Sequence, residues 1–223
     1  MKAKKKGNLL MSLGVVCLAA AIALVVWNMH SENSANASSS EALQQLASAI
    51  PEKEEVTVYP GLSESMETIV TNPEEIEYPD YILDPGMDMP EVNIDGWDYI
   101  GVLDIPALGL SLPVISSWSY PALNVAPCRY MGSAYMDDLI IAAHNFNCHF
   151  GQLKNLSPDS EIIFTDMDGN RFEYRVVLTE TLQPTAVEEM CADEWDLTLF
   201  TCTVGGQYRV TVRCERLETA FDN

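Results

Sequence analysis

The chain has 223 residues, enough for one domain of ordinary size together with additional segments. It carries 33 Asp and Glu against 12 Lys and Arg, which gives a formal net charge of −21 at pH 7. This excess of negative charge argues against a nucleic-acid-binding protein, because no basic surface is left to meet the phosphates.

The N-terminal residues have the composition of a membrane anchor. Lysines at positions 2, 4, 5 and 6 precede an apolar run from Leu9 to Trp27, and its 19 residues would extend about 28 Å as a helix, close to the thickness of a bilayer core. The lysines predict a cytoplasmic tail over residues 1–8, a transmembrane signal-anchor over residues 9–28 and an extracellular remainder. A cleaved signal peptide ending at Ala35-Asn36-Ala37 is the alternative, but the apolar run is longer than a typical signal sequence needs.

Residues 29–95 are predicted to form an extracellular linker. Its first part, residues 29–40, is rich in serine and asparagine and is expected to be flexible, whereas residues 41–50 could form a short helix. From Pro51 to Asp98, fourteen acidic residues accompany one basic residue, and six prolines interrupt the sequence. Such sequence repels itself and stays extended, so we interpret it as a stalk; a solvated tail without a specific role is the alternative.

From Trp97 onward the sequence changes to short apolar runs separated by turn signals, which is typical of β-strands. Asp168-Gly169 is a strong hairpin signal, and only brief helices fit, around residues 122–125 and 185–190. Many short strands in a segment of this length predict an all-β fold with a closed or nearly closed barrel. The expected strands are residues 99–105, 112–115, 139–143, 161–164, 172–179, 198–202 and 209–214.

Three residues of this segment are the parts that thiol-based acyl transfer needs. Cys202 ends the run Thr198-Leu199-Phe200-Thr201-Cys202, which suits a nucleophile at the end of a strand. Arg209 opens the next run, so a hairpin would place it beside the cysteine, where it can lower the thiol pKa and stabilise an oxyanion. His144 directly follows the apolar run 139–143 and is the candidate for proton transfer.

Other residues compete for these roles. His149 lies in the loop after His144 and is expected at the surface or at the rim of a substrate site. Arg213 shares a strand face with Arg209 and is expected to make a structural ion pair. The remaining cysteines lack zinc-ligand spacing, and an extracellular disulfide between Cys128 and Cys148 stays open.

Asp166, Asp168 and Asn170 resemble a fragment of a calcium loop. Turn chemistry explains three such residues beside a hairpin equally well or better. We therefore predict no metal and no other cofactor.

The motifs resemble those of sortases, the membrane-anchored cysteine transpeptidases of Gram-positive bacteria. Sortases carry a Thr-Leu-x-Thr-Cys strand, as in Thr198–Cys202, and an arginine at the start of the following strand, as in Tyr208-Arg209-Val210. They also carry a histidine after an apolar strand, as His144 does here, with Ala143 in place of the usual glycine. The segment Tyr99–Leu108 resembles the first strand of the catalytic domain. The resemblance implies a closed β-barrel of about eight strands, and we place the catalytic domain at residues 96–219.

The resemblance also implies a function. Cys202 would cleave an LPxTG-like sorting signal through a thioester acyl-enzyme, Arg209 would stabilise the oxyanion, and His144 as imidazolium would protonate the leaving amine. The partners would be surface proteins bearing a C-terminal sorting signal, with an amine of a peptidoglycan precursor or of a pilin as acceptor. The enzyme would lie in the cell membrane as a single-pass protein with its catalytic domain outside.

In sortases the loop before the cysteine strand contacts the substrate, and here it is the segment Glu180–Asp196. This segment is short for a class B sortase, which usually has a longer helix there, so the class stays open between a class B-like and a class D-like enzyme. The candidate substrate-binding residues are Leu182, Pro184, Val187, Thr201 and Asn145.

Three alternatives stay open. Asp84-Pro85 resembles part of the lid of pilin-polymerising sortases, although Gly86 replaces the aromatic residue of that lid; a linker turn is the other interpretation. An extracellular cysteine peptidase would use the same residues and only hydrolyse. A non-catalytic, wall-associated module could retain the fold alone.

Overall fold

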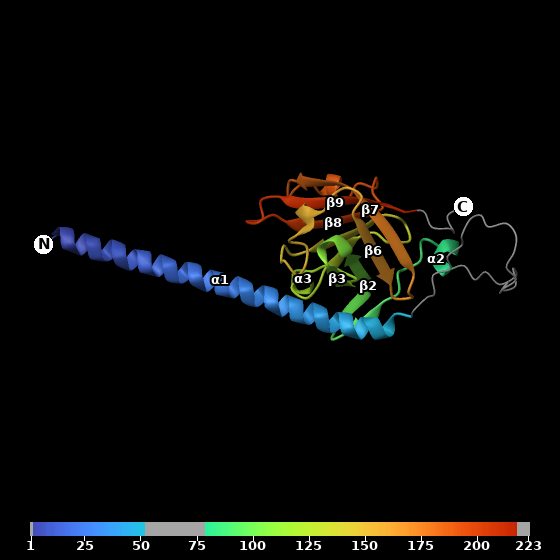
Figure 1. Ribbon diagram of the computed structural model, residues 1–223, viewed down its shortest axis with the longest axis horizontal. Helices are drawn as coiled ribbons and strands as arrows, with labels where there is room; N and C mark the ends of the chain where they lie inside the picture. The colour runs from blue at the N-terminus through green and yellow to red at the C-terminus, as the bar shows by residue number, and fades with distance from the viewer. Residues whose placement is uncertain (1, 52–78, 218–223) are drawn as a thin grey trace, which may run out of the picture.

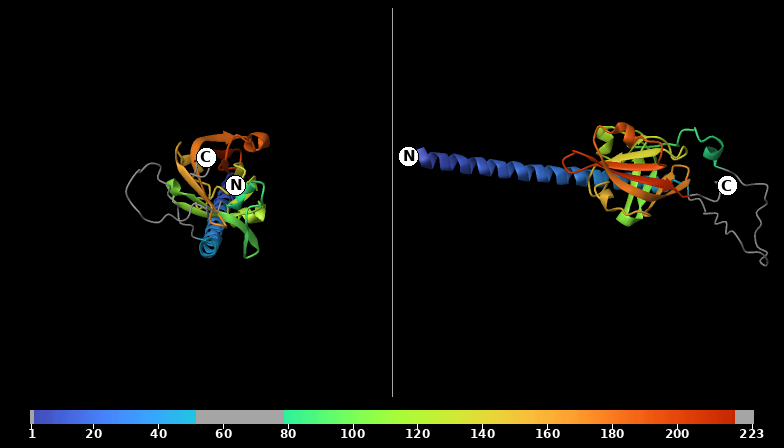
Figure 2. Two further views of the ribbon diagram at one scale, coloured as in Figure 1. Left: turned by 90° about the vertical axis from the view of Figure 1, so that its right-hand side faces the viewer. Right: turned by 90° about the horizontal axis from the view of Figure 1, so that it is seen from above.

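The computed structural model describes residues 2–51 and 79–217, with side chains from residue 11 onward. It consists of one long N-terminal helix, α1 (Lys2–Ala49), and a β-barrel built from the C-terminal part of the chain (Figure 1). The second half of α1 runs along the outside of the barrel, whereas the first half extends away from it (Figure 2).

Helix α1 differs from the expectation in its length. Its apolar half is exposed and is long and apolar enough to cross a membrane. Residues 29–40, expected to be flexible, continue the helix, and the helix predicted for residues 41–50 forms its last turns. The physical reason is burial: Ala35, Ser39, Ala42 and Leu46 recur at helical spacing and are covered.

Nine strands form one sheet, and eight of them close into a barrel in the order β2-β3-β4-β5-β8-β9-β7-β6. Closure comes from antiparallel pairing of β6 with β2, while the short β1 pairs with β2 alone. The predicted all-β barrel is therefore confirmed. The strands are β1 (Val92–Ile94), β2 (Trp97–Ile105), β3 (Leu110–Ile115), β4 (Cys128–Met131), β5 (Leu139–Ala143), β6 (Glu161–Asp166), β7 (Arg171–Leu182), β8 (Leu197–Cys202) and β9 (Arg209–Arg216).

All seven predicted strands are present, and two short strands were not predicted. Strand β1 has only three residues, and β4 contains no β-branched residue and is interrupted by a bulge. The helical turns are equally brief: α2 (Asp80–Leu83), α3 (Tyr120–Leu123), α4 (Val187–Met190) and the 3₁₀ turns η1 (Pro106–Leu108) and η2 (Leu153–Asn155). The barrel therefore depends on strand pairing and on its packed interior.

Apolar side chains form two clusters. The larger fills the barrel and includes Leu103, Phe164 and Leu199. The second lies between the barrel and α1, where Ala42 and Leu46 pack together with residues of β2, β3 and β4. The end of α1 is thus part of the folded domain.

The Asp168-Gly169 hairpin turn is organised by Asp166. One oxygen of its buried carboxylate accepts hydrogen bonds from the backbone N–H groups of Asp168 and Asn170. The other accepts from the Tyr135 hydroxyl and from the Asn170 side chain, each at 2.7 Å. The carboxylate is fully occupied, so turn chemistry explains these residues, as predicted.

The Asp84-Pro85 segment does not cover Cys202. It follows α2, which lies at the opposite end of the barrel from the β8–β9 turn (Figure 1). Tyr81 of α2 stacks on Tyr135 with ring centroids 4.7 Å apart, which holds the segment there. The lid hypothesis is therefore wrong for this structure. Most of the predicted acidic stalk, residues 52–78, lies outside the described residues.

Candidate active site

The pairing of three strands brings the predicted catalytic residues together. Strands β5 and β8 run parallel with Ala143 opposite Thr201, so His144 follows β5 at the level where β8 ends in Cys202. Strands β8 and β9 run antiparallel with Cys202 directly opposite Arg209. Neighbouring strands lie about 5 Å apart, so the cysteine sits between the histidine and the arginine.

Strand alternation separates Cys202 from its neighbour Thr201. The Thr201 side chain is buried, and its hydroxyl donates a 2.8 Å hydrogen bond to the backbone oxygen of Ala143. Cys202 points to the other face and is partly exposed. The side chain of Thr201 thus links β8 to β5 through a hydrogen bond, on the face away from Cys202.

His144 begins a tight loop. Its backbone oxygen accepts from the N–H of Phe150 at 3.2 Å, and its ring lies 5.0 Å from the ring of Phe146. The imidazole is partly buried, and this burial lowers the pKa of His144 below its usual 6.5. The ring is therefore mostly neutral at pH 7.

Helix α1 contacts the same loop. The backbone N–H of Asn147 donates to the Glu32 carboxylate at 2.7 Å, and the Cys148 thiol lies 3.7 Å from the Glu32 backbone oxygen. The loop that begins at His144 is consequently held against the helix at the point where α1 leaves its apolar half.

His149 was predicted to lie at the surface, and this prediction is wrong. The loop turns back on itself, so the His149 ring is completely buried and lies 5.8 Å from Phe146. Neither ring nitrogen has a hydrogen-bond partner among the described residues. Burial, aided by the nearby His144, lowers the pKa of His149 to about 4.

The two arginines of β9 have different surroundings. Arg213 is buried, pairs with Glu180 at 2.8 Å and donates to the Thr198 hydroxyl at 3.0 Å, which confirms its predicted structural role. Among the described residues, Arg209 donates only to the backbone oxygens of Gly206 and Tyr208, each at 3.2 Å. No carboxylate of the described residues neutralises it, so its charge is available at the Cys202 end.

Burial affects four of the other thiols. All six cysteines, each within the described residues, are free, so the disulfide between Cys128 and Cys148 is not formed. Burial raises the pKa of Cys128 to about 12 and also raises the pKa of Cys148, Cys191 and Cys214. These four thiols stay protonated at neutral pH.

The candidate substrate-binding residues differ in burial. Leu182 is buried at the end of β7, directly opposite Arg209. Pro184 and Val187 follow in the exposed β7–β8 connection, and Asn145 is exposed next to His144. These four residues lie at the end of β7, in the β7–β8 connection or directly after β5, whereas Thr201 lies on the inner face of β8.

An aromatic row beside Cys202 was not predicted. Phe200 contacts Tyr130 at 5.3 Å between ring centroids, Tyr130 contacts Trp118 at 5.6 Å, and Trp118 contacts Tyr120 at 5.9 Å. Phe200 lies in β8, Tyr130 in β4, Trp118 just before α3 and Tyr120 in α3. Sequence could not join them because β4 itself was not predicted.

No group of three His, Cys, Asp or Glu side chains among the described residues could hold a metal ion. The site consists of a thiol, an imidazole and a guanidinium, which suits nucleophilic acyl transfer.

Comparison with known proteins agrees with this geometry. A sortase domain family matches residues 103–217, more than half of the chain. No curated protein sequence matches the chain closely enough to count as a relative.

Similar solved structures include sortase A from Corynebacterium diphtheriae, with 19% identity over 57% of this chain and 64% of that chain and a TM-score of 0.49. The chain thus spans less than two thirds of that protein. The Clostridium perfringens sortase D5 transpeptidase gives 21% identity over 54% of this chain and 80% of that one, with a TM-score of 0.48. Sortase C2 of group B Streptococcus pilus island 1 gives 21% identity over 60% of this chain and 85% of that one, with a TM-score of 0.49. On the match of the sortase domain to more than half of its length, the chain belongs to the sortase family.

Proposed function

We propose that this chain is a membrane-anchored cysteine transpeptidase in which Cys202 is the nucleophile, His144 carries the proton and Arg209 stabilises the oxyanion. The observation that carries the proposal is the strand register, which places Cys202 opposite Arg209 and one position beyond the Ala143–Thr201 pair that precedes His144. This register supports the proposal, because residues suited to one reaction lie at or next to the ends of three adjacent strands.

The first half-reaction forms a thioester. The thiol proton of Cys202 passes to His144, which is mostly neutral at pH 7 and can accept it. The sulfur attacks the scissile carbonyl carbon, and the oxyanion is stabilised by the guanidinium of Arg209. The C–N bond then breaks, and His144 returns its proton to the leaving amine.

The second half-reaction transfers the acyl group. The acceptor amine attacks the thioester carbonyl and loses its proton to His144, the C–N bond forms, the C–S bond breaks, and the thiol is restored. The substrate in this proposal is an LPxTG-like sorting signal at the C-terminus of a surface protein. The acceptor is an amine of a peptidoglycan precursor or of a pilin.

Substrate side chains would contact the segments around the site. Pro184 and Val187 offer exposed apolar surface suited to a Leu-Pro motif, beside the buried Leu182, and Asn145 offers an exposed amide on the histidine side. The class of sortase, B-like or D-like, depends on this segment.

The exposed apolar half of α1 supports a single-pass membrane anchor, with the lysine-rich end in the cytoplasm and the barrel outside. Retention of the chain in the membrane after an alkaline wash, together with protease access to the barrel from outside the cell, tests this part.

Turnover of peptides by the detergent-solubilised full chain tests the enzymatic part. LPxTG-like and NPxTx-like peptides are incubated with and without triglycine, using wild type, Cys202→Ala and the matched control Cys191→Ala, whose thiol is also partly exposed. A peptide ligated to triglycine by wild type and by Cys191→Ala, but not by Cys202→Ala, supports the transpeptidase. Hydrolysis alone would identify a peptidase, and no turnover of any peptide would favour the non-catalytic module.

A further inference from the structure

The Cys202 end of the barrel lies where α1 leaves its apolar half. Glu32 contacts the loop after His144 through Asn147 and Cys148. Glu32 is five residues beyond Trp27, the last residue of the apolar run, which is about 7.5 Å along a helix axis. A spanning helix with Trp27 at the interface would therefore hold this loop beside the lipid surface.

The β8–β9 turn extends toward the same side. In Figure 1 and in the right panel of Figure 2 it is the red loop that projects from the barrel toward the N-terminal half of α1. Val204 stands on this turn with 92% of its surface exposed, and Tyr208 at its other end is 40% exposed. Because Val204 is almost fully exposed, its side chain buries almost no apolar surface against the barrel and contributes little to the stability of the fold.

Two further exposed aromatic residues belong to the outer end of the aromatic row. Trp118 is 43% exposed and Tyr120 76% exposed, and their rings contact each other. They lie at α3, which Figure 1 also places toward the N-terminal half of α1. We call Trp118, Tyr120, Val204 and Tyr208 the rim. Single exposed apolar residues are common, but four at one end of a barrel are not explained by chance exposure.

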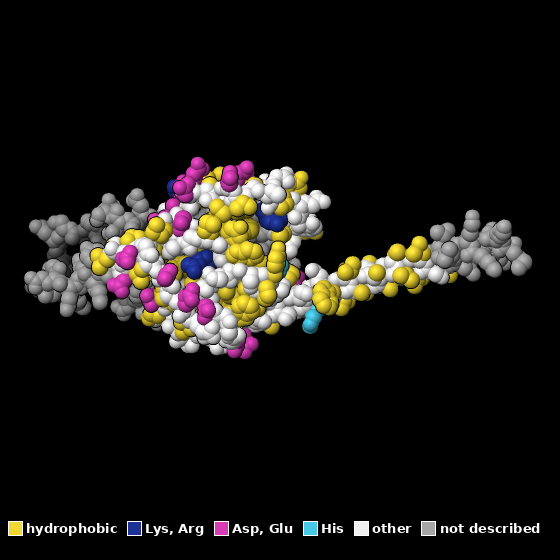
Figure 3. Space-filling view, turned by 180° about the vertical axis from the view of Figure 1, so that it is seen from behind, with side chains coloured by type: hydrophobic (Ala, Val, Ile, Leu, Met, Phe, Trp, Pro, Cys, Tyr) yellow, Lys and Arg dark blue, Asp and Glu magenta, His cyan; other side chains and the backbone are white. Residues whose placement is uncertain are grey.

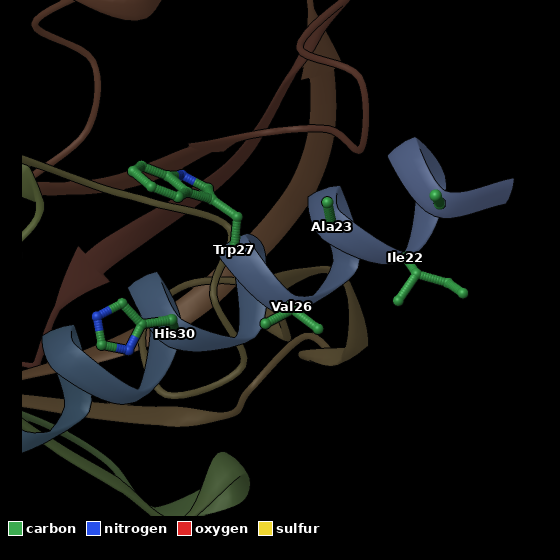
Figure 4. Close-up of a pocket in the computed structure, with 6 residues that line it drawn as sticks. Ile22, Ala23, Val26, Trp27 and His30 are labelled. Atoms are coloured by element: carbon green, nitrogen blue, oxygen red, sulfur yellow. The ribbon is translucent and has the colours of Figure 1, made fainter. Parts of the chain in front are cut away.

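The distribution of side chains over the surface agrees with this orientation. In Figure 3 hydrophobic side chains gather on the part of the barrel nearest the free half of α1, whereas most acidic side chains lie toward the other end. Figure 4 shows the transition on α1 itself, where Trp27 and His30 follow the apolar residues Ile22, Ala23 and Val26.

We propose that the rim docks on the outer surface of the lipid bilayer and holds the Cys202 end of the barrel against it. The proposal rests on the membrane anchor proposed above. Tyr and Trp favour the interface between lipid and water, because an apolar ring can enter the lipid while its polar atom stays hydrated. The rim itself consists of apolar and aromatic side chains, so docking is expected through apolar contact.

Docking of the rim restricts the substrates. A scissile bond can reach Cys202 only if it is presented close to the membrane, as in a protein or an acceptor that is itself held by a lipid or by a transmembrane segment. A freely diffusing peptide must instead enter between the rim and the lipid. The orientation of the barrel thereby selects membrane-tethered substrates.

The test measures how deeply the rim lies in lipid. The full chain is placed in phosphatidylcholine nanodiscs with and without bromine on the acyl chains, and quenching of tryptophan emission is recorded. Val204→Trp adds an indole at the rim. The matched control, Leu83→Trp, adds one at a 76% exposed apolar position on α2, at the opposite end of the barrel (Figure 1).

The indole introduced by Val204→Trp is expected to be quenched to an extent comparable to Trp27, whose own signal is obtained by difference from Trp27→Phe. The indole introduced by Leu83→Trp is expected to stay unquenched, and added salt should change neither result, because the contact is apolar. If the indoles at positions 204 and 83 are both unquenched while Trp27 is quenched, the docking proposal is overturned and the membrane anchor is retained. An unquenched Trp27 would overturn the anchor and docking together, and peptide turnover in detergent tests the chemistry independently of both.

Discussion

Burial of His149 predicts a specific loss of stability in mild acid. The folded protein holds this imidazole with a pKa of about 4, whereas the unfolded chain has the ordinary value of about 6.5. Between these pH values the unfolded state binds a proton at His149 and the folded state does not. The free energy of unfolding is therefore unaffected by this group above about pH 6.5 and decreases as the pH falls toward 4. Lowering the pH from 7 to 5 should cost about 2 kcal/mol through this one group.

The assay compares urea unfolding of the detergent-solubilised full chain and of His149→Phe at pH 7 and pH 5. The phenyl ring keeps the contact with Phe146 and cannot be protonated. Whatever the substitution costs at pH 7, the variant should lose about 2 kcal/mol less than wild type between the two pH values. His144 is present in both proteins, so its own titration cancels. Equal losses in the two proteins would show that His149 is not buried as a neutral group.

Four other substitutions test separate parts of the account. Arg213→Met should lower the free energy of unfolding by about 3 kcal/mol, because it leaves Glu180 and the Thr198 hydroxyl without their partner. Arg209→Met should lower it by under about 0.5 kcal/mol yet lower kcat by about 100-fold or more. The reverse pattern would exchange the roles of the two arginines. Leu46→Ala should cost about 3 kcal/mol in urea unfolding, because it opens a cavity between α1 and the barrel, and an unchanged midpoint would show that α1 does not pack there. Thr201→Val should cost about 1–2 kcal/mol in the same assay, because the Ala143 oxygen loses its buried donor.

Strands β5, β8 and β9 could be predicted because local sequence determines them. The runs ending in Ala143 and Cys202 and the run opening at Arg209 are bounded by turn residues, and period-two alternation fixes which side chains share a face. The pairing of β8 with β9 was predicted from the short turn between them, whereas the parallel pairing of β5 with β8 was not predicted. Strand alternation put Arg209 and Arg213 on one face of the same strand. From the sequence, a structural ion pair was predicted for Arg213 and the catalytic role for Arg209, which lies nearer the turn.

Tertiary packing decided what could not be predicted. Residues 29–40 have a composition that suggests flexibility, but Ala35 and Ser39 are covered in the structure, and this burial sustains the helix. His149 is polar and lies in a loop, and only the backbone geometry of that loop turns it inward. A chain shortened to begin at residue 51 would therefore lose the packing of Leu46 on the barrel. Functional assays should use the full chain.

A covalent adduct on Cys202 tests the central claim most directly. The detergent-solubilised full chain is incubated, without acceptor, with the intact peptide that it was found to cleave. The mass of the whole protein is then measured, and the adduct is located by proteolytic mapping. The account predicts one acyl group on Cys202, released by hydroxylamine as expected of a thioester, transferred to triglycine on addition, present in Cys191→Ala and absent from Cys202→Ala. An acyl group on another residue, or peptide cleavage by Cys202→Ala at the wild-type rate, would contradict it.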